Sequence, residues 1–148
     1  MHTTFRTAFA GLALSAAMVL GPAPAALAET VAFKAELKAS SEVPPVESKG
    51  SGTLTATYDT ASKSLSYTAN YSGLTGDATA AHFHGPAAAG VNAGVVVPVT
   101  GSAASPIKGS AILTDAQAAD LTAGRWYFNI HTAANKGGEL RGQVVKGP

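Results

Sequence analysis

The sequence contains no cysteine, and its only two methionines are Met1 and Met18. Everything after residue 28 therefore lacks sulfur, which excludes disulfide bonds, thiolate zinc sites, iron–sulfur clusters and blue-copper centres. A domain formed by this part of the chain must be held by its hydrophobic core without cross-links. Any metal that it binds must be held by nitrogen and oxygen ligands.

An excess of charge of one sign is also missing. Ten Lys and Arg residues face nine Asp and Glu residues, so the formal net charge is +1, and the charges are scattered. Without a basic stripe, neither a nucleic acid nor an anionic membrane is expected as a partner. The Gly-rich segment 85–94 has no Lys and no strand–loop–helix context for binding phosphate, and no Gly-x-Ser-x-Gly motif is present. We therefore expect no organic cofactor.

Long hydrophobic runs are confined to the N-terminus. The uncharged run Ala8–Gly21 follows Arg6 and precedes the small-residue tripeptide Ala26-Leu27-Ala28, as in a cleavable secretory signal. A retained membrane anchor is the less favoured alternative, because the run is too short to cross a hydrocarbon core of about 30 Å. The sequence predicts a signal peptide at 1–28 and a single domain at 29–148. The expected location is periplasmic or secreted, with no membrane contact after cleavage.

Helical periodicity is nearly absent after residue 28. The exception is the capping box Thr114-Asp115-Ala116-Gln117, which predicts about two helical turns that end at Gly124. Elsewhere polar and apolar residues alternate, which predicts strands at 31–37, 53–58, 64–71, 79–84, 95–99, 107–113, 125–131 and 140–145. Pro98 cannot donate to a strand ladder, so its strand is expected at a sheet edge. The predicted fold is all-β, an antiparallel Greek-key β-sandwich or flattened barrel of about eight strands with one short crossover helix.

Three histidines follow the signal, and their spacing matters more than their number. His82 and His84 are two apart on one expected strand, so they share a face, and Phe83 points to the other. On the strand at 125–131, Trp126, Phe128 and Ile130 form an apolar face that must be core, which leaves Tyr127, Asn129 and His131 opposite. If the two strands are neighbours, the three imidazoles converge on the outer, solvent side of one sheet. Such a set can hold Cu(II) or Zn(II), or it can be a purely structural hydrogen-bonded cluster.

Four motifs in the chain resemble, in order, the signature of the CHRD domain family. They are Ser41-Glu42-Val43-Pro44-Pro45-Val46, Ala81-His82-Phe83-His84-Gly85-Pro86-Ala87, Asn129-Ile130-His131-Thr132 and Gly138-Glu139-Leu140-Arg141-Gly142-Gln143. The family is named after chordin, an extracellular developmental protein, and also occurs in bacterial secreted proteins. The resemblance implies an extracytoplasmic β-sandwich-like domain, for which an extracytoplasmic protein is a possible partner. Lys136 departs from it, because the family's loop tends to have a proline there.

The three-histidine layout also resembles the copper half of Cu/Zn superoxide dismutase, another Greek-key sandwich with an H-x-H strand and a late histidine. The sequence after the signal has no fourth histidine that could bridge to a second metal. This absence weakens the interpretation as a redox enzyme. A three-histidine site for copper or zinc is still compatible with the resemblance.

Four further polar residues are candidates for supporting the site. Glu139 and Arg141 are two apart on one expected strand and can pair with each other or with Glu42. One interpretation is an Arg–carboxylate bridge that ties the Pro44-Pro45 loop to the last strand. In the other, Glu42 or Glu139 is an acceptor that orients a metal-binding imidazole. Asn129 could have the same role beside His131, or it could bond to a loop backbone.

The leading hypothesis is an exported, non-enzymatic binding module that coordinates one Cu(II) or Zn(II) through His82, His84 and His131. The alternative is a structural or protein-interaction domain whose histidines only brace loops. A redox enzyme of the dismutase type is the third hypothesis.

Overall fold

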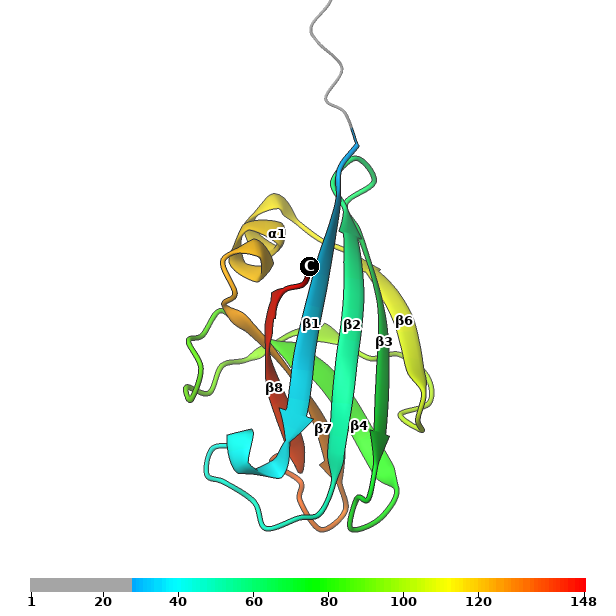
Figure 1. The fold of residues 1–148 in the computed structure, drawn as a ribbon, viewed down its shortest axis with the longest axis vertical. Helices are drawn as coiled ribbons and strands as arrows, with labels where there is room; N and C mark the ends of the chain where they lie inside the picture. The colour runs from blue at the N-terminus through cyan, green and yellow to red at the C-terminus, as the bar shows by residue number, and fades with distance from the viewer. Residues whose placement is uncertain (1–27) are drawn as a thin grey trace, which may run out of the picture.

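A computed structural model describes residues 28–148, which form eight strands, one α-helix and one short 3-10 helix. The strands are β1 (Thr30–Lys38), β2 (Ser51–Asp59), β3 (Ser64–Ser72), β4 (Ala78–His84), β5 (Val95–Pro98), β6 (Ile107–Ile112), β7 (Trp126–Thr132) and β8 (Leu140–Lys146), and the helices are η1 (Ala39–Ser41) and α1 (Asp115–Thr122) (Figure 1). All eight predicted strands are present. The predicted signal peptide lies, up to residue 27, outside the described residues.

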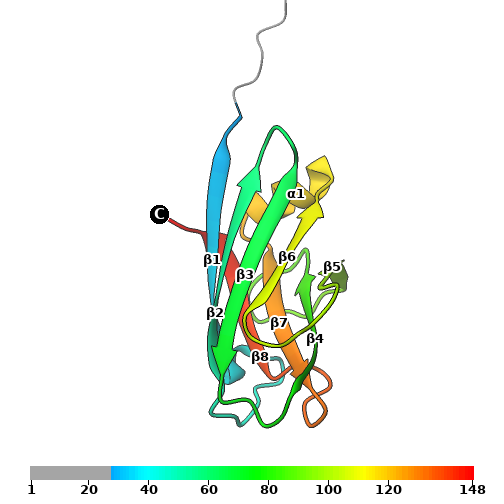
Figure 2. The ribbon, with the colours of Figure 1, turned by 90° about the vertical axis from the view of Figure 1, so that its right-hand side faces the viewer.

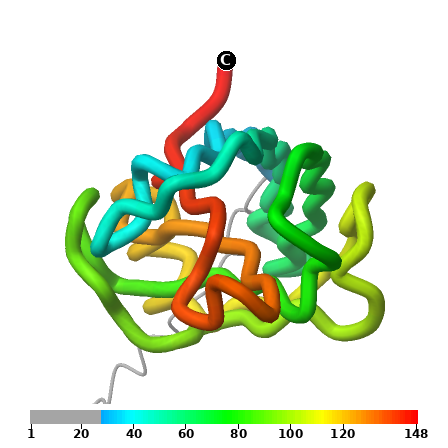
Figure 3. Tube along the Cα trace, turned by 90° about the horizontal axis from the view of Figure 1, so that it is seen from below, coloured from blue at the N-terminus to red at the C-terminus, as the bar shows by residue number. Residues whose placement is uncertain are grey.

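The strands form one antiparallel sheet in the order β5-β4-β7-β8-β1-β2-β3-β6. This sheet rolls over on itself, as the views from the side and from below show (Figures 2 and 3). Tyr67 of β3 and Phe83 of β4, which are five strands apart along the sheet, meet in a T-shaped contact with ring centroids 5.0 Å apart. The architecture is therefore a nearly closed, flattened barrel, which confirms the predicted fold class.

Alternation of buried and exposed residues explains the hairpin of β2 and β3. Leu54 and Ala56 of β2 are opposite Ala69 and Tyr67 of β3, and all four are buried. Their neighbours in sequence are mostly exposed Thr and Ser residues on the outer face. Such a half-buried surface suits an antiparallel strand with one face on the core.

β7 departs from this alternation. Trp126, Phe128 and Ile130 are fully buried in the core, as predicted, but Tyr127 and Asn129 on the opposite face are also only 3% and 2% exposed. The loops at 39–50 and 85–94 cover this outer face. The expectation that the outer face is open to solvent is therefore wrong for β7, because loops far away in sequence pack onto it.

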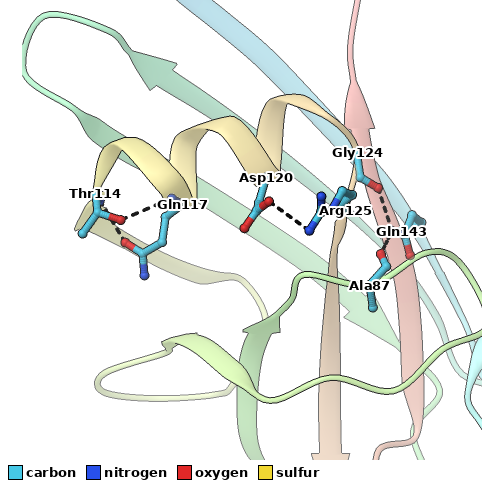
Figure 4. Close-up of polar contacts among 7 residues, drawn as sticks. All are labelled: Ala87, Thr114, Gln117, Asp120, Gly124, Arg125 and Gln143. Carbon is cyan, nitrogen blue, oxygen red and sulfur yellow. Dashed lines mark hydrogen bonds and ion pairs between the residues drawn. The ribbon is translucent and has the colours of Figure 1, made fainter.

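The sheet edges and the helix follow local sequence rules. β5, which contains Pro98, is at one edge of the sheet, as its missing N–H predicted. α1 connects β6 at the opposite edge to β7, so it is a crossover helix, and Thr114 and Gln117 form the predicted capping box (Figure 4). Gly124 ends the segment with a φ of 70°, a left-handed conformation that favours glycine.

The end of α1 is tied to the sheet by polar contacts. Arg125 pairs with Asp120 at 3.3 Å, and the Gln143 side chain of β8 donates to the carbonyls of Gly124 at 2.7 Å and Ala87 at 3.0 Å (Figure 4). Gln143 therefore joins the helix to the start of the loop at 85–94. Within residues 28–148, no helix is long and apolar enough to cross a membrane.

Candidate metal centre

The three histidines come together because β4 and β7 are neighbours in the sheet (Figure 2). In the register of this pair His82 is opposite Asn129 and Ala80 is opposite His131, so His82 and His131 are diagonal neighbours on one face. His84 lies on the same face because it is two residues along β4. Strand alternation and strand order together therefore assemble the cluster that the sequence predicted.

The ring nitrogens of the cluster are close enough to share one ion. His82 Nδ1 lies 3.1 Å from His131 Nε2, and the rings of His82 and His84 have centroids 5.6 Å apart. One nitrogen from each of the three rings lies within 4.8 Å of the other two. The structure thus holds a group of three histidines that could hold a metal ion.

Backbone carbonyls face the Nδ1 atoms of two of these rings. His84 Nδ1 is 2.9 Å from the carbonyl oxygen of Ala93, and His131 Nδ1 is 2.9 Å from that of Lys136. A carbonyl only accepts, so in the neutral His84 ring the proton is on Nδ1 and the lone pair is on Nε2. His131 has an acceptor beside each nitrogen, the Lys136 carbonyl at Nδ1 and Asn129 Oδ1 at Nε2, so these contacts do not select one tautomer for it. His84 Nε2 is buried and has no hydrogen-bond partner. A metal-binding histidine needs this state, with one nitrogen donating to a carbonyl and the other bare.

The pKa values of His82 and His131 are lowered from the ordinary histidine value. Burial is the largest cause for both rings, and the neighbouring His131 and His84 rings lower the pKa of His82 further. For His131 the Lys136 carbonyl acts in the opposite direction and His84 in the same direction as burial. Both rings are therefore neutral at pH 7, as metal ligands must be.

A stack of side chains continues from His84 into the protein. The rings of His84 and Tyr127 are parallel within 2°, with centroids 4.8 Å apart, and the Arg141 guanidinium carbon lies 3.5 Å from the Tyr127 ring centre on β7. Arg141 donates to the Val91 carbonyl at 2.6 Å and to the Asn92 side chain at 2.7 Å. It therefore clamps the loop at 85–94.

The expected Arg–carboxylate bridge is not formed. Among residues 28–148 the ion pairs within 4.0 Å are Lys38–Glu36, Lys63–Asp115 and Arg125–Asp120, so Arg141 has no carboxylate partner. The reason is that backbone and amide acceptors of the loop at 85–94 take the guanidinium donors.

Glu42 and Asn129 lie between the histidines and Arg141. Asn129 Oδ1 is 3.0 Å from His131 Nε2, and its amide nitrogen is 3.5 Å from the Gly137 carbonyl. Glu42 is 5% exposed, and its Oε1 has no hydrogen-bond partner. Burial raises the pKa of Glu42 to about 7, although the Arg141 charge, the Val43 backbone and the Asn129 side chain act to lower it. Neither the Glu42 nor the Glu139 carboxylate forms a hydrogen bond with an imidazole ring. The side chain that contacts His131 directly is Asn129.

Glu139 has a different environment, where three loops meet. Its fully buried carboxylate accepts hydrogen bonds from Ser48 Oγ at 2.6 Å, Thr75 N at 2.8 Å, Thr75 Oγ1 at 2.6 Å, Thr132 Oγ1 at 2.7 Å and Asn135 Nδ2 at 3.0 Å. Burial alone would raise its pKa, but these bonds outweigh burial and hold the pKa at about 2. Glu139 therefore joins loops and does not orient a histidine.

Sequence reasoning missed the two carbonyls of Ala93 and Lys136 and the stacking role of Tyr127. Tyr127 was placed on the histidine face by alternation, but nothing in its identity distinguishes a stacking partner from a surface tyrosine. The carbonyls belong to every residue alike, so only the loop conformation shows which of them face a ring. No local sequence signal could have found them.

Comparison with known proteins gives one match. The sequence model of the CHRD domain family matches residues 33–144, which is most of the chain. No curated protein and no solved structure matches the chain.

Proposed function

We propose that this chain, which belongs to the CHRD domain family, is an exported binding module that coordinates one Cu(II) or Zn(II) through His82, His84 and His131. The observation that carries the proposal is the convergence of one nitrogen from each ring to within 4.8 Å. The part of the chain after the signal contains no other histidine and no cysteine, so all of its imidazole ligands are in this group and it has no thiolate ligand.

The hydrogen bonds identify which nitrogens bind the ion. His84 uses Nε2, because its Nδ1 donates to the carbonyl of Ala93. His131 also uses Nε2, the atom that faces His82, with its proton on Nδ1 toward the Lys136 carbonyl, so the metal takes the place of the Nε2 contact with Asn129 Oδ1. His82 uses Nδ1, the atom that faces His131 Nε2 at 3.1 Å. In the metal-free protein one proton between these two atoms makes a hydrogen bond. With metal on Nδ1, the neutral His82 ring carries its proton on Nε2 instead.

The general ligand preference of the metals, and not the spread of distances, favours Cu(II) over Zn(II). With metal–nitrogen bonds of about 2.0–2.1 Å, a tetrahedral zinc site keeps all nitrogen pairs about 3.4 Å apart. A tetragonal copper site has neighbouring nitrogens about 3 Å apart and opposite ones about 4 Å apart. The pair at 3.1 Å fits either geometry, whereas the span of up to 4.8 Å exceeds what either allows, so the rings would move closer to bind one ion. Copper(II) binds nitrogen ligands more tightly than zinc does in general.

A purely structural cluster is the second candidate, and one observation favours it. The His82–His131 contact at 3.1 Å is itself a hydrogen bond that needs no metal. In that case the three rings only brace β4 against β7 and the loops that cover them, and the module would act through a protein surface.

Metal titration of the tag-free protein from residue 29 onward separates the two candidates. We expect one Cu(II) per chain with a Kd below about 10 μM, and loss of that binding in His82→Ala, His84→Ala and His131→Ala. Lys136→Ala is the matched control, because it removes an exposed side chain but keeps the carbonyl that faces His131. Binding that survives all three histidine substitutions, or no binding to the unaltered protein, contradicts the proposal.

Export is the second part of the proposal, and it rests on the predicted signal at residues 1–28. N-terminal sequencing of the protein recovered outside the cytoplasm should begin at Glu29. An extracytoplasmic location brings the module into contact with metal ions and proteins outside the cell. Recovery of the full chain from the cytoplasm alone would contradict this part.

A further inference from the structure

The carbonyl of Ala93 is shared between the candidate metal centre and the loop that covers it. It accepts from His84 Nδ1 at 2.9 Å and from the Tyr127 hydroxyl at 3.2 Å. The Ala93 amide in turn lies 3.2 Å from the same hydroxyl, which can accept its proton. The orientation of the His84 ring and the position of this end of the loop at 85–94 therefore depend on the same group.

The Tyr127 ring packs between His84 and Arg141 and so supports the His84 ring. Its ring stacks on His84 within 2° of parallel, and its other face receives the Arg141 guanidinium. Arg141 is 2% exposed and binds the Val91 carbonyl and the Asn92 side chain of the same loop. Asn92 also donates to the Val43 carbonyl at 3.1 Å, which connects the loop to the segment at 39–46.

Metal at His84 Nε2 changes the strength of this connection. A bound cation withdraws electron density from the imidazole, so the Nδ1–H group becomes a stronger donor to the Ala93 carbonyl. A stronger bond at this carbonyl stabilises the loop in its observed position. By reciprocity, this position of the loop favours metal binding by the same factor.

We propose that Tyr127 is a positioning residue that couples the stability of the loop at 85–94 in its observed position to metal binding at His84. The inference rests on the proposed function. Arg141 supports Tyr127 by stacking and holds the loop at Val91 and Asn92, so it belongs to the same coupling. The structural alternative is that Tyr127 only fills space on the outer face of β7.

Two measurements on four variants test the coupling. Cu(II) affinity is measured by competition with a chromophoric chelator for the unaltered protein, Tyr127→Leu, Tyr127→Phe and Tyr71→Phe. Amide hydrogen exchange of the segment 85–94 is followed by mass spectrometry with and without saturating Cu(II). Tyr71→Phe is the matched control, because the Tyr71 hydroxyl makes the same kind of bond to a loop carbonyl, that of Ala103 at 2.7 Å.

We expect Tyr127→Leu to weaken metal binding about 10- to 100-fold, as loss of a ligand-orienting contact does. Tyr127→Phe keeps the stack and loses the hydroxyl bond, so binding should weaken about three- to tenfold. The control should bind as the unaltered protein does. Metal should slow exchange in the segment 85–94 of the unaltered protein, and much less in Tyr127→Phe.

Other outcomes overturn the inference. If both Tyr127 variants bind metal within about twofold of the unaltered protein, or if metal leaves exchange at 85–94 unchanged, the coupling is absent. Should Tyr127→Leu fail to fold, the Tyr127→Phe result decides alone. If the unaltered protein binds no metal, the proposed function fails first, and the inference fails with it.

Discussion

Replacing Glu139 by Gln tests the polar cluster that joins three loops at the end of the barrel. The carboxylate accepts five hydrogen bonds, from side chains of the loops at 46–50, 73–77 and 132–138 and from the Thr75 amide. A glutamine amide carries two protons where one carboxylate oxygen was, and these protons face the existing donors. Hydroxyls can turn to accept, but the Thr75 amide and the Asn135 side-chain NH₂ cannot.

The pKa of Glu139 gives the size of the expected effect. It is about 2 in the folded protein and 4.5 ordinarily, because the hydrogen bonds outweigh burial. This lowering corresponds to about 3 kcal/mol of stability. Since the folded pKa is the lower one, the contribution is complete above pH 4.5 and is lost as the pH falls from 4.5 toward 2. The substitution should therefore cost about 3 kcal/mol at pH 7 and much less near pH 2.

Urea unfolding of the two proteins between pH 2.5 and pH 7 measures this difference. Glu36→Gln is the matched control, because Glu36 is exposed and pairs only with the exposed Lys38, so stability should not change measurably. We expect the curves of the unaltered protein and Glu139→Gln to converge on acidification. A constant gap at all pH values, or a gap below about 1 kcal/mol at pH 7, would refute the account of this cluster.

Three further predictions concern the loops and the histidines. Burial raises the pKa of Glu42 to about 7, so the ionised carboxylate destabilises the folded protein and the protonated one does not. Glu42→Gln should therefore raise the free energy of unfolding by up to about 3 kcal/mol at pH 8 and hardly at all below pH 4.5, as urea unfolding at the two pH values measures. Gly138→Ala should destabilise the protein by at least about 2 kcal/mol in thermal unfolding, because Gly138 has a φ of 131° and an added Cβ would overlap Glu42 Oε1. Gly137→Ala is the control, because its added Cβ meets open space. The lowered pKa values of His82 and His131 mean that the folded state resists protonation of these rings, so stability falls as the pH drops below about 6.5. The melting temperature should fall more steeply in metal-loaded than in apo protein, and equal pH profiles of the two forms would contradict the metal site.

Local periodicity was sufficient to predict the strands. Period-two alternation identified strands such as β1, β2 and β3, the apolar run at 95–99 identified β5, Pro98 identified an edge, and the Thr114 capping box identified the helix. These features depend on contacts between neighbours in sequence or on backbone chemistry at one residue. The same alternation, combined with adjacency of β4 and β7, was enough to bring His82, His84 and His131 together.

The environment of the site could not be predicted in the same way. Tyr127 and Arg141 are buried because the loops at 39–50 and 85–94 fold over the outer face, and loop conformation is not encoded in strand periodicity. The pairing of Arg141 was wrong for this reason, because acceptors from the loop replaced the expected carboxylate. One interpretation made Glu139 an acceptor for an imidazole, whereas its carboxylate accepts hydrogen bonds from Ser48 and Thr75, which are far away in sequence.

The most direct test of the central claim is electron paramagnetic resonance of the tag-free protein loaded with one equivalent of Cu(II). The account predicts a single tetragonal Cu(II) signal with hyperfine splitting from three nitrogens, one of which is lost in His84→Ala. A spectrum of free or adventitious copper, unchanged when His82, His84 or His131 is replaced by Ala, would contradict it.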